Sequence, residues 1–352
     1  MSDLKLSVLD LIPLRGGQSS RQALLSSQAL AQEADRLGYT RYWVAEHHNM
    51  DAIVSTVPAV LIPFLSQGTS QIRFGSGGVM LANHAPFAVG EQFALLSEML
   101  PGRIDLGLGR APGSDQLTAA VLRQALPGDG VQNYIQDVTL LRELLGSGKT
   151  PVGEKLHVDI AGRPFQLQAT PAMSTVPEIW LLGSSAYSAE AAGMLGLPYV
   201  FANHFGMPGI DKTLRIYREN YQPSPQFPEP RTLVPVNVVV AETEEEARKL
   251  ALPQKLSTAR LRTGGKIEPQ PTVDDMEDYS WSARELTAPA ANPDSLFVGT
   301  PDRVAAGVKE LASRLDADEV MVSPIAGAYA ADDLERGERR EQTLSLLAAE
   351  LL

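Results

Sequence analysis

The chain contains no cysteine among its 352 residues. This absence excludes disulfide bonds, a thiolate nucleophile and any metal ion or cluster held by cysteine. The sequence also lacks an uncharged apolar run of about 18 residues, which a membrane-spanning helix requires. Its first apolar stretch is interrupted by Asp10 and Pro13 before it could form the core of a signal peptide. We therefore expect a cytoplasmic protein without a membrane partner.

Basic residues are few and scattered. The 30 lysines and arginines face 42 aspartates and glutamates, which gives a formal net charge of −12. No run of five or six basic residues could follow a phosphate backbone, so nucleic acid is not expected as a partner. Hydrophobic residues make up 44% of the chain and charged residues 20%. These proportions are typical of a packed globular protein.

Short stretches rich in aliphatic and β-branched residues alternate with segments of helical periodicity, which predicts a parallel sheet. The expected strands lie near residues 4–12, 41–46, 71–80, 103–108, 177–182, 198–202, 232–241 and 318–323. The expected helices cover residues 20–37, 86–99, 132–145, 186–195, 209–221, 301–315 and 332–351. Eight strands are the number of a (β/α)8 TIM barrel, and we interpret residues 1–352 as one such domain.

Two segments exceed a minimal βα repeat. Residues 147–176 contain several glycines and prolines and one weak strand pattern at 155–160, which predicts an insertion after the fourth strand. Residues 253–300 are rich in proline, glycine and acidic residues and show little periodicity. A segment of this kind after the seventh strand is expected to form a mobile lid, with Trp281 and Phe297 available for closure.

A doubly wound sheet would show the same alternation of strands and helices. Its dinucleotide-binding form requires Gly-x-Gly-x-x-Gly after the first strand, where this chain has Leu14-Arg15-Gly16-Gly17-Gln18-Ser19. Gly107 and Gly109 follow the fourth strand, but the next glycine is Gly113, one residue too late. The barrel is therefore the favoured architecture.

The ends of the predicted strands are polar, and in such barrels the reacting groups stand on the loops that follow the strands. Four of the five histidines lie there: His47, His48, His84 and His204. Bracing a loop is as common a role for any one of them, but their convergence favours a functional site. A metal centre is disfavoured because neighbouring residues of a strand point to opposite faces, so His47 and His48 could not both ligate one ion. A glycosidase would need two facing carboxylates, whereas strand four ends in Gly109-Arg110.

Arg110 is a candidate ligand for an anion. Its guanidinium follows strand four and suits two-pronged binding of a phosphate or carboxylate, although an ion pair with a nearby acid is equally common. Strand five ends in Gly183-Ser184-Ser185 and a helix with Tyr187 in its first turn follows. Because helix N-termini attract anions through free N–H groups, these residues together predict a phosphate pocket.

These motifs resemble those of the bacterial luciferase-like flavin-dependent monooxygenases, in particular the single-chain luciferase family oxidoreductases, over almost the whole chain. The resemblance is carried by Trp43-Val44-Ala45-Glu46-His47-His48-Asn49, Gly75-Ser76-Gly77-Gly78-Val79-Met80-Leu81, Asn83-His84-Ala85-Pro86, Pro101-Gly102-Arg103-Ile104-Asp105-Leu106-Gly107-Leu108-Gly109-Arg110-Ala111-Pro112-Gly113, Trp180-Leu181-Leu182-Gly183-Ser184-Ser185 and Val298-Gly299-Thr300-Pro301.

The resemblance implies a barrel that uses reduced FMN and dioxygen. It implies that His47 takes part in proton transfer, that Arg110 binds the FMN phosphate, and that the backbone around Gly183, Ser184 and Ser185, with Tyr187, completes the phosphate site. A cis peptide bond against the flavin ring would fall at Gly77–Gly78, where a β-bulge is the alternative. A luciferase cysteine near the flavin is replaced here by Gly109, and an acidic residue by Gly183, so the details of flavin contact and light emission do not carry over. The implied assembly is a homodimer through the second and third barrel helices.

The predicted activity is oxidation of a small organic substrate, aldehyde-like or apolar, by a monooxygenase, with the flavin supplied by a separate reductase or reduced in place by NAD(P)H. Two alternatives remain open. Related barrels use a deazaflavin for hydride transfer or reduce FMN with NAD(P)H, and some relatives bind flavin without turnover.

Overall fold

The computed structural model describes residues 4–123, 131–289 and 292–352. Eight parallel strands close into a barrel: β1 (Lys5–Asp10), β2 (Arg41–Val44), β3 (Arg73–Met80), β4 (Ile104–Gly109), β7 (Glu178–Gly183), β8 (Tyr199–Phe201), β9 (Thr232–Val240) and β11 (Glu319–Pro324). They are paired in the order β9-β11-β1-β2-β3-β4-β7-β8, and β8 returns to β9 to close the ring. The predicted (β/α)8 barrel is confirmed and the doubly wound alternative is wrong.

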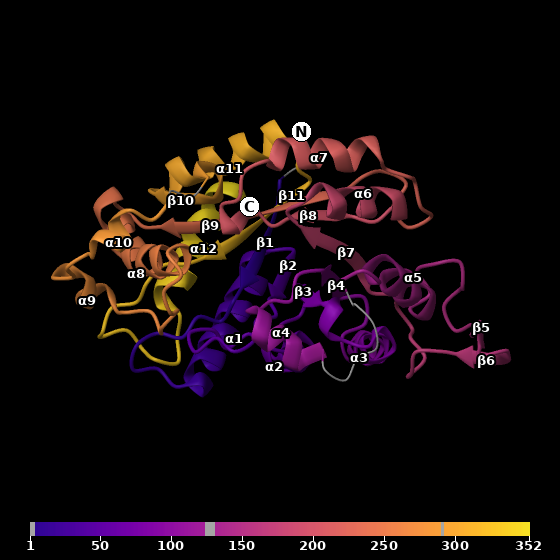
Figure 1. Ribbon diagram of the computed structural model, residues 1–352. Helices are drawn as coiled ribbons and strands as arrows, with labels where there is room; N and C mark the ends of the chain where they lie inside the picture. The colour runs from indigo at the N-terminus through magenta and orange to yellow at the C-terminus, as the bar shows by residue number, and fades with distance from the viewer. Residues whose placement is uncertain (1–3, 124–130, 290–291) are drawn as a thin grey trace.

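Helices surround the strands (Figure 1). They are α1 (Ser20–Leu37), α2 (Pro58–Leu65), α3 (Pro86–Met99), α4 (Gln116–Arg123), α5 (Tyr134–Leu144), α6 (Ala186–Leu195), α7 (Ile210–Glu219), α8 (Glu244–Arg262), α9 (Val273–Glu277), α10 (Ala283–Leu286), α11 (Pro301–Leu315) and α12 (Glu338–Leu351). Three short 3₁₀ turns complete the described elements. The turn η1 (Leu81–Asn83) follows β3, and η2 (Asn203–Phe205) follows β8. The turn η3 (Pro293–Ser295) precedes the short strand β10 (Leu296–Gly299). No helix of the described segments is long and apolar enough to cross a membrane.

The first βα unit shows how local sequence sets these boundaries. Ser19 caps α1, because its side chain accepts the N–H of Gln22 while the Gln22 side chain accepts the N–H of Ser19. Gly38 ends the helix with φ of 86°, a left-handed conformation that glycine adopts without steric cost. The chain is thereby turned directly into β2.

Both predicted insertions are present, and one expectation about them is partly wrong. After β4 the chain forms an antiparallel hairpin of β5 (Leu156–Ile160) and β6 (Arg163–Leu167), which projects from one end of the molecule (Figure 1). The segment 253–300 is more regular than expected, because α8 continues to Arg262 and is followed by α9, α10, η3 and β10. Residues 290–291 of this segment lie outside the described residues. Its mobility stays a prediction.

Pro253 lies inside α8, where a proline usually breaks a helix. A proline inside a helix lacks one N–H donor and leaves carbonyls of the preceding turn without their usual partner. Here the N–H of Gly327 donates to the carbonyl of Leu250 at 2.8 Å. A side chain at Gly327 would meet the Pro253 ring at 2.6 Å, so the glycine also makes room for the ring. The loop after β11 thus packs against α8 beside the proline.

The barrel interior holds a buried cluster of charged side chains at the end opposite to the cavity mouth. The Arg41 guanidinium contacts carboxylates from three other strands: Asp105 at 2.7 Å, Glu319 at 3.1 Å and Glu178 at 3.2 Å. Arg73 binds the second oxygen of Asp105 at 2.6 Å. These groups lie at the amino ends of the strands. They close the barrel on the side opposite to its mouth, and an apolar layer that includes Leu9, Trp43, Trp180 and Met321 packs within the barrel.

Candidate active site

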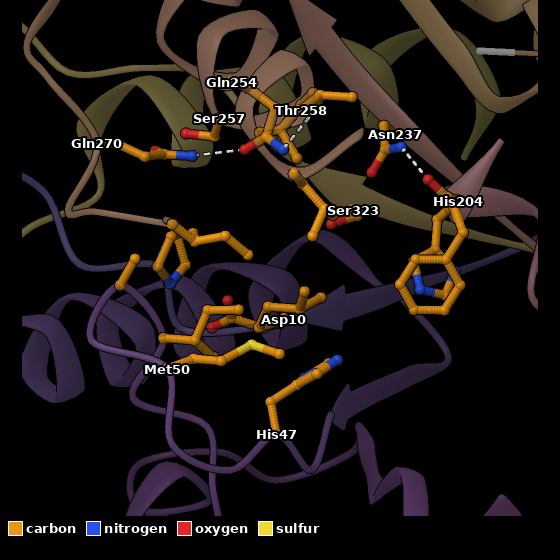
Figure 2. Close-up of a pocket in the computed structure, with 18 of the residues that line it drawn as sticks. Asp10, His47, Met50, His204, Asn237, Gln254, Ser257, Thr258, Gln270 and Ser323 are labelled. Carbon is orange, nitrogen blue, oxygen red and sulfur yellow. Dashed lines mark hydrogen bonds between the residues drawn. The ribbon is translucent and has the colours of Figure 1, made fainter. Parts of the chain in front are cut away.

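A cavity of about 460 Å³ opens at the carboxyl ends of the strands. Its floor and walls come from residues at the ends of β1, β2, β4, β8, β9 and β11, and its roof comes from α8 and the chain that follows it. Figure 2 shows Asp10, Met50 and His47 on one side of this space and Gln254, Ser257, Thr258 and Gln270 on the other. The cavity thus lies between the barrel mouth and the predicted lid.

His47 faces this cavity, and the alternation of β2 explains why. Arg41 and Trp43 point into the barrel. Because every second residue of a strand points to the same face, continuing this alternation places His47 on the inner face as well. Burial lowers the pKa of His47 below its ordinary value of 6.5, and this effect outweighs the opposing influence of Glu46. The imidazole is therefore neutral at pH 7. Its Nδ1 is buried without a hydrogen-bond partner in the described chain, so a ligand reaches the ring through Nε2.

His48 and His84 have a different task. The Nε2 atoms of both rings lie 2.8 Å from the same oxygen of Glu46, and the other oxygen accepts the N–H of Met80 at 3.1 Å. Burial would raise the pKa of Glu46, but the hydrogen bonds from His84 and His48 outweigh burial and lower it. The buried carboxylate thus joins the loops after β2 and β3. Of the four rim histidines, only His47 and His204 line the cavity among the described residues.

The peptide bond Gly77–Gly78 is cis, at the position that the resemblance implies. The pairing of β3 with β4 is irregular between Ser76 and Val79, so the strand also has the bulge-like shift that was the alternative. A side chain at Gly77 would meet Leu9 at 2.9 Å, and one at Gly78 would meet the carbonyl of Gly107 at 2.8 Å. Packing against the backbone of β4 therefore requires glycine at 78, while at 77 the end of the Leu9 side chain leaves little room.

Arg110 and Tyr187 are brought together beside the cavity wall. Gly109 pairs with Leu182, so the ends of β4 and β7 adjoin, and the Arg110 guanidinium lies over the Tyr187 ring at 4.2 Å. Arg110 is half-buried, and no carboxylate of the described segments lies within 4 Å of its guanidinium. The alternative of an ion pair with a neighbouring acid is therefore not found there.

The two serines at the start of α6 differ. Ser185 caps α6, because its hydroxyl accepts the N–H of Ser188 at 3.4 Å. Ser184 is exposed directly before this cap. Gly183 lies against Ser188, whose Oγ would be 2.3 Å from an added side chain, and Gly109 lies similarly against Met80. Packing thus fixes Gly183 as glycine and leaves little room at Gly109, while Arg110, Ser184 and the first turn of α6 remain accessible to an anion.

The polar side chains that cover the cavity were not predicted from the sequence. Gln270 donates to the side chain of Gln254 at 2.5 Å, and Gln254 donates to Thr258 at 3.3 Å. The backbone of Gln270 is bound to Leu14 and Gly16 at 2.8 Å each, so this segment is fixed across the barrel mouth. Trp281 and Phe297, proposed for closure, do not line the cavity within the described chain, whereas Leu261 and Ile267 do. The start of α8 could have been predicted from the sequence. Thr243 is a capping residue, and the acidic residues Glu244, Glu245 and Glu246 follow it in the first turn.

Within residues 4–123, 131–289 and 292–352, no group of three or more histidine, aspartate or glutamate side chains is arranged to hold a metal ion.

Comparisons with known proteins agree with this geometry. A family model described as luciferase-like monooxygenase matches residues 4–318. An Escherichia coli K12 protein named luciferase-like monooxygenase is 39% identical and 90% of each chain is covered. The N-acetyl-S-alkylcysteine monooxygenase of Bacillus subtilis is 32% identical, with 92% of this chain and 94% of the relative covered.

Solved structures show the same fold. Apo-MsnO8 has a TM-score of 0.83 and 32% identity, with 99% of both chains covered. A second structure is a type II Baeyer-Villiger monooxygenase in complex with FMN, the oxygenating constituent of 3,6-diketocamphane monooxygenase from Pseudomonas putida. It has a TM-score of 0.71 and 18% identity, and the match covers 99% of this chain and 98% of that chain. An F420-dependent secondary alcohol dehydrogenase has a TM-score of 0.63 and 14% identity, and the match covers 98% of this chain and 99% of that chain.

Proposed function

The chain belongs to the luciferase-like monooxygenase family, and we propose that it is an oxidoreductase that uses reduced FMN and dioxygen to oxidise a small organic substrate. The observation that carries the proposal is the half-buried Arg110, which is close to the N-terminus of α6 and has no carboxylate partner in the described segments. A half-buried guanidinium without a counter-charge favours an anionic ligand.

Arg110 and the first turn of α6 would hold the phosphate of FMN. The guanidinium is held over the Tyr187 ring at 4.2 Å, which limits its freedom before any ligand binds. The N-terminus of the ten-residue helix adds N–H donors and a partial positive charge. The backbone at Gly183, Ser184 and Ser185 would line the same pocket. This chemistry of the donors fits a phosphate ester.

The cavity beside this pocket would hold the reacting part of the cofactor and the substrate. Gly77 and Gly78 are proposed to lie next to the flavin ring. Bound reduced FMN supplies the two electrons that, with dioxygen and two protons, place one oxygen atom in the substrate and release the other as water. His47, neutral and directed into the cavity, would deliver a proton from Nε2. The roof formed by α8 and Gln270 would exclude water.

The test of this proposal is the substitution Arg110→Ala. We expect the dissociation constant for FMN to rise by about 10- to 100-fold, which corresponds to the loss of a hydrogen bond to a charged group, about 1.5–3 kcal/mol. Binding of riboflavin, which has no phosphate, should change by less than about twofold. Quenching of flavin fluorescence on titration with the purified chain measures both constants.

The control is Arg163→Ala in the exposed hairpin, which should leave both constants unchanged. Equal losses of FMN and riboflavin affinity in the Arg110 variant would place the phosphate elsewhere. The same samples distinguish the alternative activities. Loss of flavin colour on anaerobic addition of NADPH would indicate a reductase acting on its own flavin, and flavin binding without added oxygen uptake would indicate a binding protein.

A further inference from the structure

His204 lies in the same cavity as His47 and comes from the opposite side of the barrel. His47 follows β2 and His204 follows β8, and these strands are four places apart in the ring of eight. Both residues line the cavity, and His47 is close enough to influence the charge of His204. The two imidazoles therefore border one space from two sides (Figure 2).

The turn that carries His204 is fixed by three side chains. Asn237 of β9 donates to the carbonyl of His204 at 2.8 Å, and buried Asn203 donates to the carbonyl of Asp294 at 2.8 Å. Arg262 at the end of α8 donates to the carbonyl of Phe205 at 3.1 Å. The rings of His204 and Phe205 pack with their centres 4.1 Å apart. This support from β9, α8 and the neighbouring ring holds the imidazole in one place.

His204 presents a hydrogen-bond donor rather than a charge. Burial and the neighbouring His47 lower the pKa of His204 to about 3, so the ring is neutral at pH 7. Its Nδ1 is buried and has no hydrogen-bond partner in the described chain. A buried N–H without an acceptor is rarer than an unused lone pair, so we assign the proton to Nε2. The nitrogen that a ligand can reach therefore carries a hydrogen.

The charged residues that line the cavity are already engaged. Arg340 binds Asp10 at 2.5 Å and the carbonyl of Pro324 at 2.9 Å. Arg262 donates to the carbonyls of Phe205 and Pro289. Most of the other lining residues are apolar, among them Leu11, Met50, Ile53, Leu261, Ile267 and Ile325. The cavity therefore favours an uncharged body over an ion.

We propose that Nε2–H of His204 donates a hydrogen bond to an oxygen atom of the substrate, and that the substrate is an uncharged molecule with an apolar body and one accepting oxygen, such as a carbonyl. This inference rests on the proposed function, because it places the substrate in the cavity assigned to the reaction. His204 would orient the substrate toward His47, which handles protons, so the two histidines have separate roles.

The test compares two ligands of the same shape, cyclohexanone and methylenecyclohexane, which differ in having an oxygen or a CH2 group. Ligand-observed NMR measures their dissociation constants with the chain loaded with oxidised FMN and with the FMN-free chain. We expect His204→Leu to weaken cyclohexanone about tenfold more than methylenecyclohexane, as one lost hydrogen bond implies. His204→Gln, which keeps an N–H donor, should restore most of the difference. His157→Leu in the exposed hairpin is the control.

Equal losses for both ligands in His204→Leu would show that His204 only fills space and would overturn the proposal. Tighter binding of cyclohexanecarboxylate than of cyclohexanone would overturn the substrate class. If His204→Leu does not fold, His204→Phe is measured in its place, since it fills similar space without a donor. Failure of the chain to bind FMN would contradict the proposed function alone, because the comparison of the two ligands is also made without FMN.

Discussion

Replacing Arg41 with methionine is expected to lower the free energy of unfolding by about 3–5 kcal/mol, the usual cost of removing one member of a buried ion cluster. Arg41 is almost fully buried and contacts Asp105, Glu178 and Glu319 inside the barrel. Methionine fills similar volume but leaves these carboxylates with less positive charge. Urea denaturation followed by circular dichroism measures the change. The substitution Arg36→Ala, which removes an exposed ion pair on α1, is the control and should have little effect.

The same substitution should change the response to acid. Burial would raise the pKa of Asp105, but Arg41 and Arg73 outweigh it and hold the pKa below the ordinary 3.8. Such a carboxyl adds stability above its unfolded pKa, and this stability is lost as the pH falls through the folded value. With Arg41 removed, the pKa of Asp105 rises and the midpoint of acid unfolding should move to higher pH. An unchanged stability and acid midpoint would show that the cluster is not a determinant of the fold.

Replacing His47 with glutamine is expected to lower the rate of substrate oxidation by about 10²- to 10⁴-fold, the range for loss of a general acid or base. Glutamine is similar in size but cannot deliver a proton at neutral pH. The affinity for FMN should stay within about twofold, because the proposed phosphate site at Arg110 is separate. The rate is measured with reduced FMN on a panel of bicyclic ketones and aldehydes, with N-acetyl-S-alkylcysteines as charged comparison compounds, by depletion of substrate.

The control for His47 is His157→Gln, which changes an exposed histidine far from the cavity. His48→Gln should have a smaller effect than His47→Gln, because His48 binds Glu46 and does not line the cavity. A loss below about threefold in His47→Gln, or an equal loss in His48→Gln, would remove His47 from the proposed proton transfer.

The strands could be predicted because each carries a short aliphatic run, and all eight predicted ranges contain an observed barrel strand or most of one. Five helices were not predicted: α2, α4, α8 and the short α9 and α10. In α2, Pro58 and Pro63 resemble breaks, although Pro58 occupies the first helical turn, where proline is favourable. In α8, Pro253 is accommodated by a contact with Gly327, which is distant in sequence. Local patterns do not contain such a contact.

The positions of some site residues could also be predicted from the sequence, and others could not. Strand alternation already separates His47 from Glu46 and His48, once Arg41 and Trp43 are known to point inward. The shared partner of His48 and His84 was not predictable, because it depends on how β2 and β3 are aligned. The polar roof at Gln254 and Gln270 depends on the path of a long connection across the barrel mouth. The sequence alone therefore does not predict how neighbouring strands are aligned or which path a long connection takes across the barrel mouth.

Binding of FMN through its phosphate, at Arg110 and the N-terminus of α6, is the basis of the proposed activity. The most direct test is a titration of the unaltered chain with FMN, riboflavin and F420 under the same conditions. We expect FMN to bind at least about tenfold more tightly than riboflavin, and more tightly than F420. Equal affinities for FMN and riboflavin would contradict binding through the phosphate, and a preference for F420 would contradict FMN as the cofactor.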